Sequence, residues 1–266
     1  MTGKSPALIQ LQKERVQHFF EVYSRRIDFI DSLCSERNFE RVLLCCCCID
    51  SLGKYYCEAH GLGTGNQERF MTFLSLAQPK YPELDSVWIT GLEISLRDAG
   101  ETDLADYLAD KCGANVSNLV WNENYDPDLQ KQELEKRASQ DLPKDRAERM
   151  KETATDFTYS KIIWRQYRNP SVHEGRFSHP WDYRNGPTPF TSVANTVGIE
   201  KGKAAHYHRV QLGVPPTFLV GCLRESFHLF QTGTTSSLKK MEDMYDTLRT
   251  ITQQGDYSFR VPARVH

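Results

Sequence analysis

Apolar residues recur at steps of three and four along most of this chain, and that period predicts α-helices. The first such run covers residues 8–33, where Val16, Phe20 and Ile27 share one face. A second run, residues 39–58, is apolar nearly all round, which is typical of a central helix. The same reasoning predicts helices at residues 67–76, 83–96, 102–112, 129–151 with a break near Pro143, 157–167, 217–232 and 236–253.

The periodic pattern fails in two places. Residues 115–128 are polar, and residues 175–189 are rich in proline, glycine and aromatic residues, so both predict loops. Residues 189–197 and 204–210 have strand-like character and predict a small β-hairpin. The fold class we expect is therefore mainly α. We place residues 1–266 in a single helical domain, with a helical insertion at about 80–150 and a loop and hairpin at about 175–215.

The composition of the chain limits the kinds of molecule that it is expected to bind. The chain has 266 residues and a formal net charge of −2, so any nucleic-acid contact must come from a local basic patch. No apolar run approaches the length of a membrane span, and residues 1–12 lack the pattern of a signal peptide. We expect a cytoplasmic protein with reduced thiols and no membrane contact.

Four of the eight cysteines are consecutive, Cys45 to Cys48. Successive side chains on a helix point about 100° apart, so these four cannot converge on one metal ion. Only Cys45 and Cys48 share a face. Because the run lies between apolar residues, we interpret it as part of a core helix, and we assign no metal ligands and no cofactor.

Residues 168–173 carry the strongest chemical signal. Arg168 is a permanent cation whose donors suit a phosphate, and His173 is able to take up or release a proton near neutral pH. Asn169 lies between them, and Pro170 predicts that the backbone leaves helical geometry. A phosphate-binding cation beside a proton-transfer group is the combination that phosphodiester cleavage requires. A structural role is the alternative, with Arg168 capping a helix and His173 in a turn.

These residues resemble the signature of the HEPN superfamily, an arginine followed by a polar residue and then a histidine. Four residues separate Arg168 from His173 here, the short end of the family's range, and Pro170 is among them. The specific match covers about ten residues, while the helices before and after it fit more loosely. The resemblance implies a HEPN-like helical bundle with additional helices that pairs into a homodimer.

The same resemblance implies a metal-independent endoribonuclease, with toxin–antitoxin or phage-defence systems as its setting. Arg168 would bind the phosphate, His173 would act as the acid–base group, and Asn169 would orient the site. The 2′-hydroxyl of RNA would attack the adjacent phosphorus, leaving 2′,3′-cyclic phosphate and 5′-hydroxyl ends. The expected partners are an RNA substrate, a second copy of the chain, and an antitoxin or other defence-system protein.

Neighbouring residues suggest support for this site. Arg165 lies three residues before Arg168, on one face of an α-helix, and with Arg176 would extend a phosphate track. Asp50 lies inside the most apolar helix, where an unpaired carboxylate is costly, so it pairs either with Arg168 or with Lys54. Glu174 either tunes His173 or faces water.

Two other functions stay open beside the nuclease. The first is a non-catalytic HEPN-like module that uses this surface to bind RNA, a nucleotide or a protein. The second is a helical scaffold in which the motif is accidental.

Overall fold

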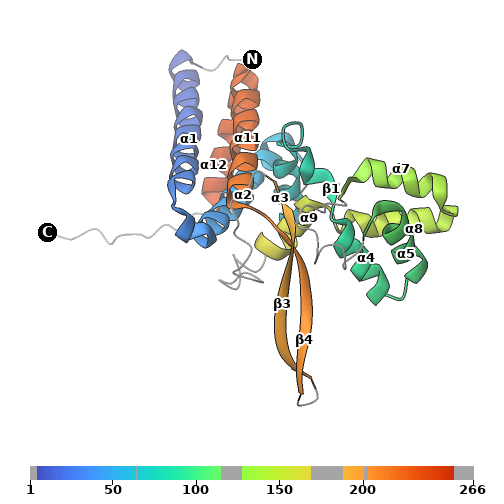
Figure 1. Cartoon of the computed structure of the whole chain (residues 1–266). Coiled ribbons are helices and arrows are strands. Elements are labelled where there is room, and N and C mark those ends of the chain that lie inside the picture. The colour runs from blue at the N-terminus through green and yellow to red at the C-terminus, as the bar shows by residue number, and fades with distance from the viewer. Residues whose placement is uncertain (1–4, 64, 115–127, 169–187, 201–202, 255–266) are drawn as a thin grey trace.

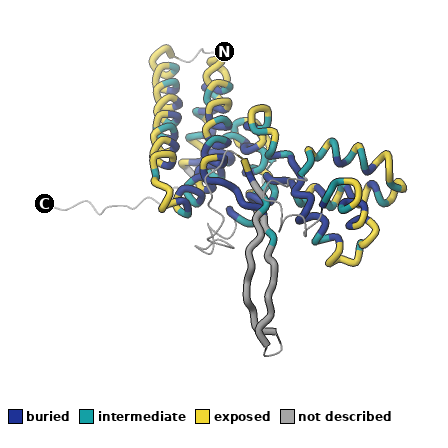
Figure 2. The backbone as a smooth tube through the Cα atoms, in the orientation of Figure 1, coloured by how far each residue is buried: buried dark blue, intermediate teal, exposed yellow. Residues whose placement is uncertain are grey.

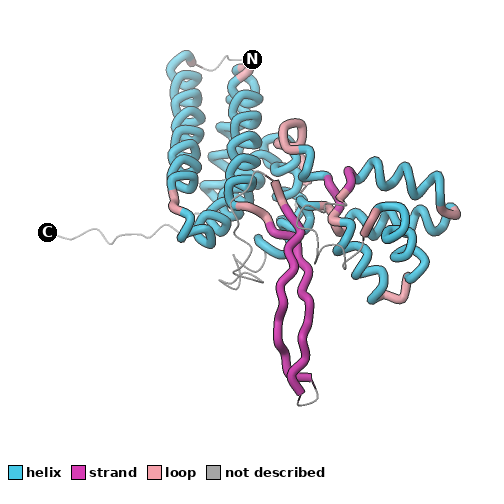
Figure 3. The backbone as a smooth tube through the Cα atoms, in the orientation of Figure 1, coloured by secondary structure: helices cyan, strands magenta, loops and turns pink. Residues whose placement is uncertain are grey.

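A computed structural model describes residues 5–63, 65–114, 128–168, 188–200 and 203–254, and it is mainly α-helical, as the sequence predicts (Figures 1 and 3). The helices are α1 (Pro6–Ser32), α2 (Asn38–His60), α3 (Asn66–Ser75), α4 (Ile89–Asp98), α5 (Thr102–Cys112), α7 (Lys131–Asp141), α8 (Lys144–Thr155), α9 (Tyr159–Ile162), α11 (Pro216–Thr235) and α12 (Leu238–Gln254). The strands are β1 (Ser86–Val87), β2 (Leu129–Gln130), β3 (Phe190–Glu200) and β4 (Lys203–Gly213). Two 3₁₀ turns, η1 (Ser35–Arg37) and η2 (Pro82–Asp85), and one π-helix, η3 (Ile163–Arg168), complete the described elements.

The helices α1, α2, α3, α11 and α12 surround the larger of two hydrophobic cores, which we call the main core (Figures 1 and 2). Aromatic rings from four of these helices meet at Phe230, whose ring centroid lies 5.3 Å from that of Phe20, 5.4 Å from Tyr56 and 6.2 Å from Phe73. Such edge-to-face contacts add to the hydrophobic free energy of burial. The main core therefore joins the two ends of the chain, since α1 and α12 pack against each other.

Helix α2 runs through the main core and carries the cysteine run. Cys45, Cys46 and Cys48 are buried, while Cys47 is exposed. Burial raises the pKa of the Cys46 thiol well above its ordinary value and that of Cys48 to about 11. The interpretation of this run as core is confirmed for the three buried thiols. Helix α2 ends at Gly61, whose positive φ of 61° supplies the left-handed turn that glycine adopts without strain.

A second core lies to the other side of the molecule and is built from α4, α5, α7 and α8 (Figure 1). Its buried side chains include Ile89, Leu104, Leu108 and Met150. Arginines and carboxylates from α4, α5 and α8 form ion pairs around it. The segment thus has a hydrophobic core of its own.

The structure differs from the predicted helix at residues 83–96. Residues Ser86–Val87 form strand β1, which pairs antiparallel with Leu129–Gln130, and α4 begins only at Ile89. The Oδ1 atom of Asp128 accepts a hydrogen bond from the Ile89 backbone N–H at 2.8 Å and caps this end. Because these partners lie about 40 residues away in the sequence, a local period does not reveal them.

The hairpin after residue 188 is present and longer than predicted. Strands β3 and β4 pair antiparallel in continuous register from Phe190–Gly213 to Glu200–Lys203 and project from the helical body (Figure 1). At its base, the Trp88 indole N–H donates to the Thr191 hydroxyl at 3.0 Å. None of the helices in the described ranges is long and apolar enough to cross a bilayer.

Candidate active site

Arg168 is the last residue of the π-helix η3, which continues from α9 along one side of the main core. Ile163, Trp164 and Tyr167 anchor this segment in the core. The Tyr167 hydroxyl donates to the Leu212 carbonyl and accepts from the Val214 backbone N–H, both at 2.9 Å. The end of β4 therefore fixes the turn from which Arg168 projects.

The guanidinium of Arg168 is held from two sides. Its Nη2 atom donates to Oδ2 of Asp50 at 2.6 Å, and its Cζ atom lies 4.3 Å from the centre of the Trp164 ring. The Arg168 side chain is 5% exposed and that of Asp50 is 27% exposed. Charge-assisted hydrogen bonds and cation–π contacts strengthen when water is excluded, so this cation has a defined position.

The sequence offered Asp50 two partners, and the structure pairs it with Arg168. Asp50 comes from α2, 118 residues earlier in the chain, so the ion pair joins two distant segments. Asp50 therefore holds the buried guanidinium of Arg168 in one orientation, which is one of the two pairings that the sequence predicts for this carboxylate. Whether the pair serves catalysis remains a prediction.

The prediction that Arg165 and Arg168 share one helical face is wrong, while a phosphate contact of Arg165 stays a prediction. The Arg165 side chain is 52% exposed and its Nη2 atom lies 3.4 Å from Oδ2 of Asp156, whereas Arg168 points into the main core. The physical reason is the π-helix, whose hydrogen bonds join residues five apart and whose wider turn changes which side chains share a face. Arg165 is thus separate from the Arg168–Asp50 pair.

The rest of the predicted site lies outside the described residues. Asn169, His173, Glu174 and Arg176 follow Arg168 directly in the sequence, within residues 169–187. The structure describes Arg168, which precedes them. The roles assigned to the other four residues stay predictions.

Sequence reasoning missed two neighbours of Arg168. Trp164 is a core residue as expected, but it also carries the cation–π contact. Cys47 is exposed as a residue, but neighbouring atoms partly cover its thiol. This partial burial and the charge of Asp50 raise the pKa of the thiol, and the charge of Arg168 lowers it. The spacing of three residues between Cys47 and Asp50 on a helix was a signal that could have identified this neighbour.

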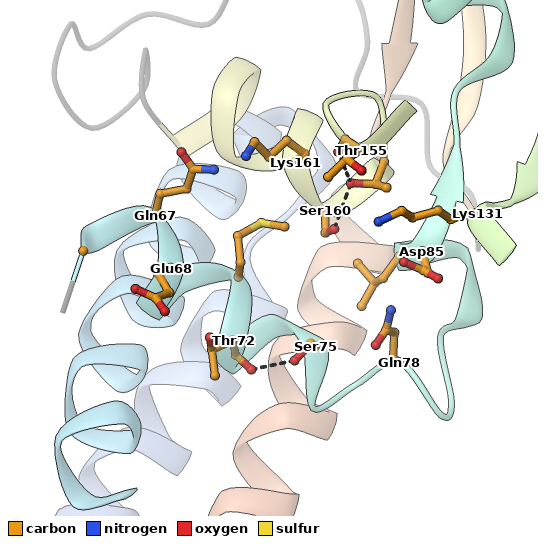
Figure 4. A pocket seen from close by; sticks show the side chains of 14 residues that line it. Gln67, Glu68, Thr72, Ser75, Gln78, Asp85, Lys131, Thr155, Ser160 and Lys161 are labelled. Atoms are coloured by element: carbon orange, nitrogen blue, oxygen red, sulfur yellow. Dashed lines mark hydrogen bonds between the residues drawn. The ribbon is translucent and has the colours of Figure 1, made fainter. Parts of the chain in front are cut away.

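A cleft of about 640 Å³ opens between α3, α9 and the start of α7 (Figure 4). Lys131 extends toward it from one side and Lys161 lies above it, and hydroxyl and amide side chains line its walls (Figure 4). Lys131 lies 3.7 Å from Glu135 and Lys161 lies 3.6 Å from Asp156, measured from Nζ to carboxylate oxygen. Burial raises the pKa of Asp85 in the wall, and Lys131 opposes that shift. The cleft is open to a small polar molecule, but no contact in it selects a chemical class.

Within the described residues, no three His, Cys, Asp or Glu side chains lie close enough together to hold a metal ion. Comparison of the chain with protein-family models, with curated proteins and with solved structures gave no match. The residues around Arg168 are therefore the candidate site in the described part of the chain.

Proposed function

We propose that this protein is a metal-independent endoribonuclease whose active site contains Arg168, Asn169 and His173. One observation carries the proposal. The guanidinium of Arg168 is fixed between Asp50 and Trp164 at the point where the Arg-Asn-x-x-x-His segment begins. A cation that is already oriented stabilises charge on a phosphate without reorganising during the reaction.

In the proposed reaction, RNA supplies its own nucleophile. His173 of one copy takes the proton of the 2′-hydroxyl, the O2′–P bond forms, and the P–O5′ bond breaks. His173 of a second copy gives a proton to the departing 5′-oxygen, so the products are a 2′,3′-cyclic phosphate and a 5′-hydroxyl. Positioned acid–base groups typically contribute about 10²–10⁴ to the rate. Arg168 binds the phosphate oxygens, and Asn169 orients the two groups.

The burial of Arg168 adds a condition to this mechanism. Because its side chain is 5% exposed, binding of RNA must uncover one edge of the guanidinium while Asp50 keeps its hold on Nη2. Arg165, which is half exposed, and Arg176 are the weaker contacts proposed for neighbouring phosphates. Glu174 is proposed to tune His173.

The setting we propose is a homodimer in the cytoplasm that acts as a toxin or in phage defence. An antitoxin or another defence-system protein would then hold the enzyme inactive or activate it. This part of the proposal follows from the HEPN resemblance alone.

The same burial favours a second candidate function. The Arg168 side chain is almost entirely covered and already paired with Asp50, and both features are also typical of an ion pair with a purely structural role. In that case the chain is a non-catalytic HEPN-like module that binds RNA, a nucleotide or a protein.

The test is cleavage of a labelled RNA by the purified full chain in the presence of EDTA. The nuclease predicts products with 2′,3′-cyclic phosphate ends, which accept a 3′-end label only after the cyclic ester is opened and the phosphate is removed. It also predicts no cleavage of the same oligonucleotide made with 2′-O-methyl groups, because the nucleophile is then blocked. Binding of RNA with no cleavage by a folded dimer supports the non-catalytic module instead.

A further inference from the structure

A groove of about 440 Å³ lies between α1, α2 and α12, on the side of α2 away from the second core. Its floor contains three half-buried aromatic rings, those of Phe19, Tyr55 and Tyr245. Its rim carries Arg15 and His18 from α1 and Arg249 from α12, all exposed; Figure 2 shows the burial along these helices. Aromatic rings below a cationic rim are the combination that binds unpaired nucleotides.

Two of the rings in the floor, Phe19 and Tyr55, contact each other edge to face, and Phe19 also contacts Tyr23 next to the groove. The Phe19 and Tyr55 centroids are 4.8 Å apart with their planes at 67°, and those of Phe19 and Tyr23 are also 4.8 Å apart. Contacts of this kind hold the rings at fixed angles. Rings that are half exposed and fixed in orientation offer flat surfaces on which bases stack.

The charges of the groove are not neutralised. No carboxylate lines it, and neither Arg15 nor Arg249 forms an ion pair with any residue in the described ranges. Arg97, Arg146 and Arg224, in contrast, each pair with two carboxylates. On a chain with a net charge of −2, exposed arginines without acidic partners mark a surface complementary to a polyanion.

The groove is connected to the Arg168 site along α2. Ser51 follows Asp50 directly, and its hydroxyl lies 2.5 Å from that of Tyr23. Tyr55 is one helical turn beyond Ser51, a rise of about 6 Å. The Arg26 guanidinium lies 5.1 Å from the centre of the Tyr23 ring, so a further cation stands beside the tyrosine that contacts Ser51.

We propose that this groove binds a stretch of single-stranded RNA and directs it along α2 toward Arg168. The bases stack on Phe19, Tyr55 and Tyr245, and Arg15 and Arg249 contact the phosphates. This inference depends on the proposed function for its substrate. A second copy of the chain is a poorer occupant, because a two-fold contact would bring unpaired arginines of both copies together.

The first test is binding of a fluorescent 2′-O-methyl oligouridine of about 12 nucleotides, which this reaction cannot cleave. In the double variant Arg15→Glu/Arg249→Glu we expect the Kd to rise at least about tenfold, because two phosphate contacts become repulsive. The slope of log Kd against log salt should fall by about 1.4, since each single-strand contact accounts for about 0.7. The matched control is Arg25→Glu/Lys239→Glu, which makes the same charge change on the same two helices and should leave the Kd within about twofold.

The second test concerns stacking. Tyr245→Leu keeps an apolar side chain in the floor but removes a ring, and we expect the Kd to rise on the order of tenfold. Photocrosslinking of a 4-thiouridine version of the oligonucleotide should label α1, α2 or α12 at the groove residues. An equal Kd for the two double variants, or crosslinks confined to other elements, would overturn the inference.

The outcomes separate this inference from the proposed function. Binding in the groove without cleavage of ordinary RNA leaves the inference standing and removes the nuclease. Cleavage of RNA with crosslinks elsewhere removes the inference and leaves the nuclease. A change of oligomeric state in Arg15→Glu/Arg249→Glu, with the Kd for RNA unchanged, assigns the groove to contact between copies and overturns the inference. A crosslink from Tyr245 to residues 255–266, with that Kd unchanged, assigns it to the end of the chain and overturns the inference as well.

Discussion

In the main core the side chain of Arg168 is 5% exposed and pairs with Asp50, which is 27% exposed, whereas around the second core the arginines are themselves open to water, with Arg97 46% and Arg146 26% exposed. The residue types and the distances are similar, since Arg168–Asp50 is 2.6 Å and Arg97–Glu93 is 2.7 Å. What differs is which partner is covered: the arginine in Arg168–Asp50, and the carboxylate in Arg97–Glu93, where Glu93 is 8% exposed. An arginine at the surface keeps much of its hydration when it forms an ion pair. A covered arginine loses its hydration, and the paired carboxylate must offset that free-energy cost.

This contrast teaches which charges are candidates for function. The arginines of the ion pairs around the second core are sufficiently explained by solvation, because their guanidinium groups stay partly open to water. A cation placed in the main core carries a desolvation cost that hydrophobic residues of the same size would avoid. We therefore look for function at Arg168, and we expect changes in the two regions to differ in size.

The largest effect on the free energy of unfolding is expected at the closely packed aromatic rings of the main core. Phe230→Ala removes the ring on which Phe20, Tyr56 and Phe73 converge, and leaves a cavity among α1, α2, α3 and α11. We expect a loss of about 3–5 kcal/mol in the free energy of unfolding, measured by urea denaturation. The neighbouring Leu229 is 40% exposed, so Leu229→Ala should cost less than about 1 kcal/mol. Similar losses for the two variants would show that Phe230 is not central to this core.

The next effect concerns the buried charge itself. Asp50→Ala leaves Arg168 without the carboxylate that balances it, and we expect a loss of about 2–3 kcal/mol, below the value for a fully buried pair because Asp50 is 27% exposed. The double variant Asp50→Leu/Arg168→Met should regain stability to within about 1 kcal/mol of the parent. If RNA cleavage is lost in this stable double variant, the pair acts in function beyond its structural part. Full activity would contradict the role assigned to Arg168.

A much smaller effect is expected around the second core. Asp103→Ala removes one of the two carboxylates that pair with Arg146, and Glu101 still lies 2.8 Å from that guanidinium. The urea midpoint should not move measurably, because exposed pairs contribute little. A shift as large as that of Asp50→Ala would remove the distinction between the two regions.

The smallest effect uses Cys47 as a reporter of the Arg168–Asp50 pair. Thiols react as thiolates, so a lower pKa means faster modification at a given pH. Asp50 raises the pKa of Cys47 and Arg168 lowers it. Asp50→Asn should therefore speed the reaction of Cys47 with a disulfide reagent near pH 8, and Arg168→Met should slow it, both measured against the exposed Cys34. Changes in the same direction in both variants would indicate altered exposure and contradict this electrostatic account.

Much of the helical fold was predictable because its helices carry their own period. The runs at residues 8–33 and 39–58 correspond to α1 and α2, and the break near Pro143 separates α7 from α8. The pairing of Asp50 with Arg168 was also within reach, since a carboxylate in an apolar helix requires a partner. These features follow from local pattern and simple electrostatics.

Backbone pairings and helix distortions that depend on distant segments were not predictable. The short pairing of β1 with β2 and the capping of Ile89 by Asp128 replace the first turns of a predicted helix. The π-helix at residues 163–168 is accompanied by the bonds of Tyr167 to β4, and it separates Arg165 from Arg168. Single-sequence periodicity assumes an α-helix, so it placed those two arginines on one face.

The central claim is tested most directly by RNA cleavage in EDTA with His173→Ala, compared with His228→Ala, which changes an exposed histidine on α11. Both variants should unfold at the same urea concentration as the parent and elute at the same size. We predict that His228→Ala cleaves RNA to cyclic-phosphate ends at the parent rate, while His173→Ala loses at least about 10²-fold. Equal cleavage by the two folded variants would contradict the account.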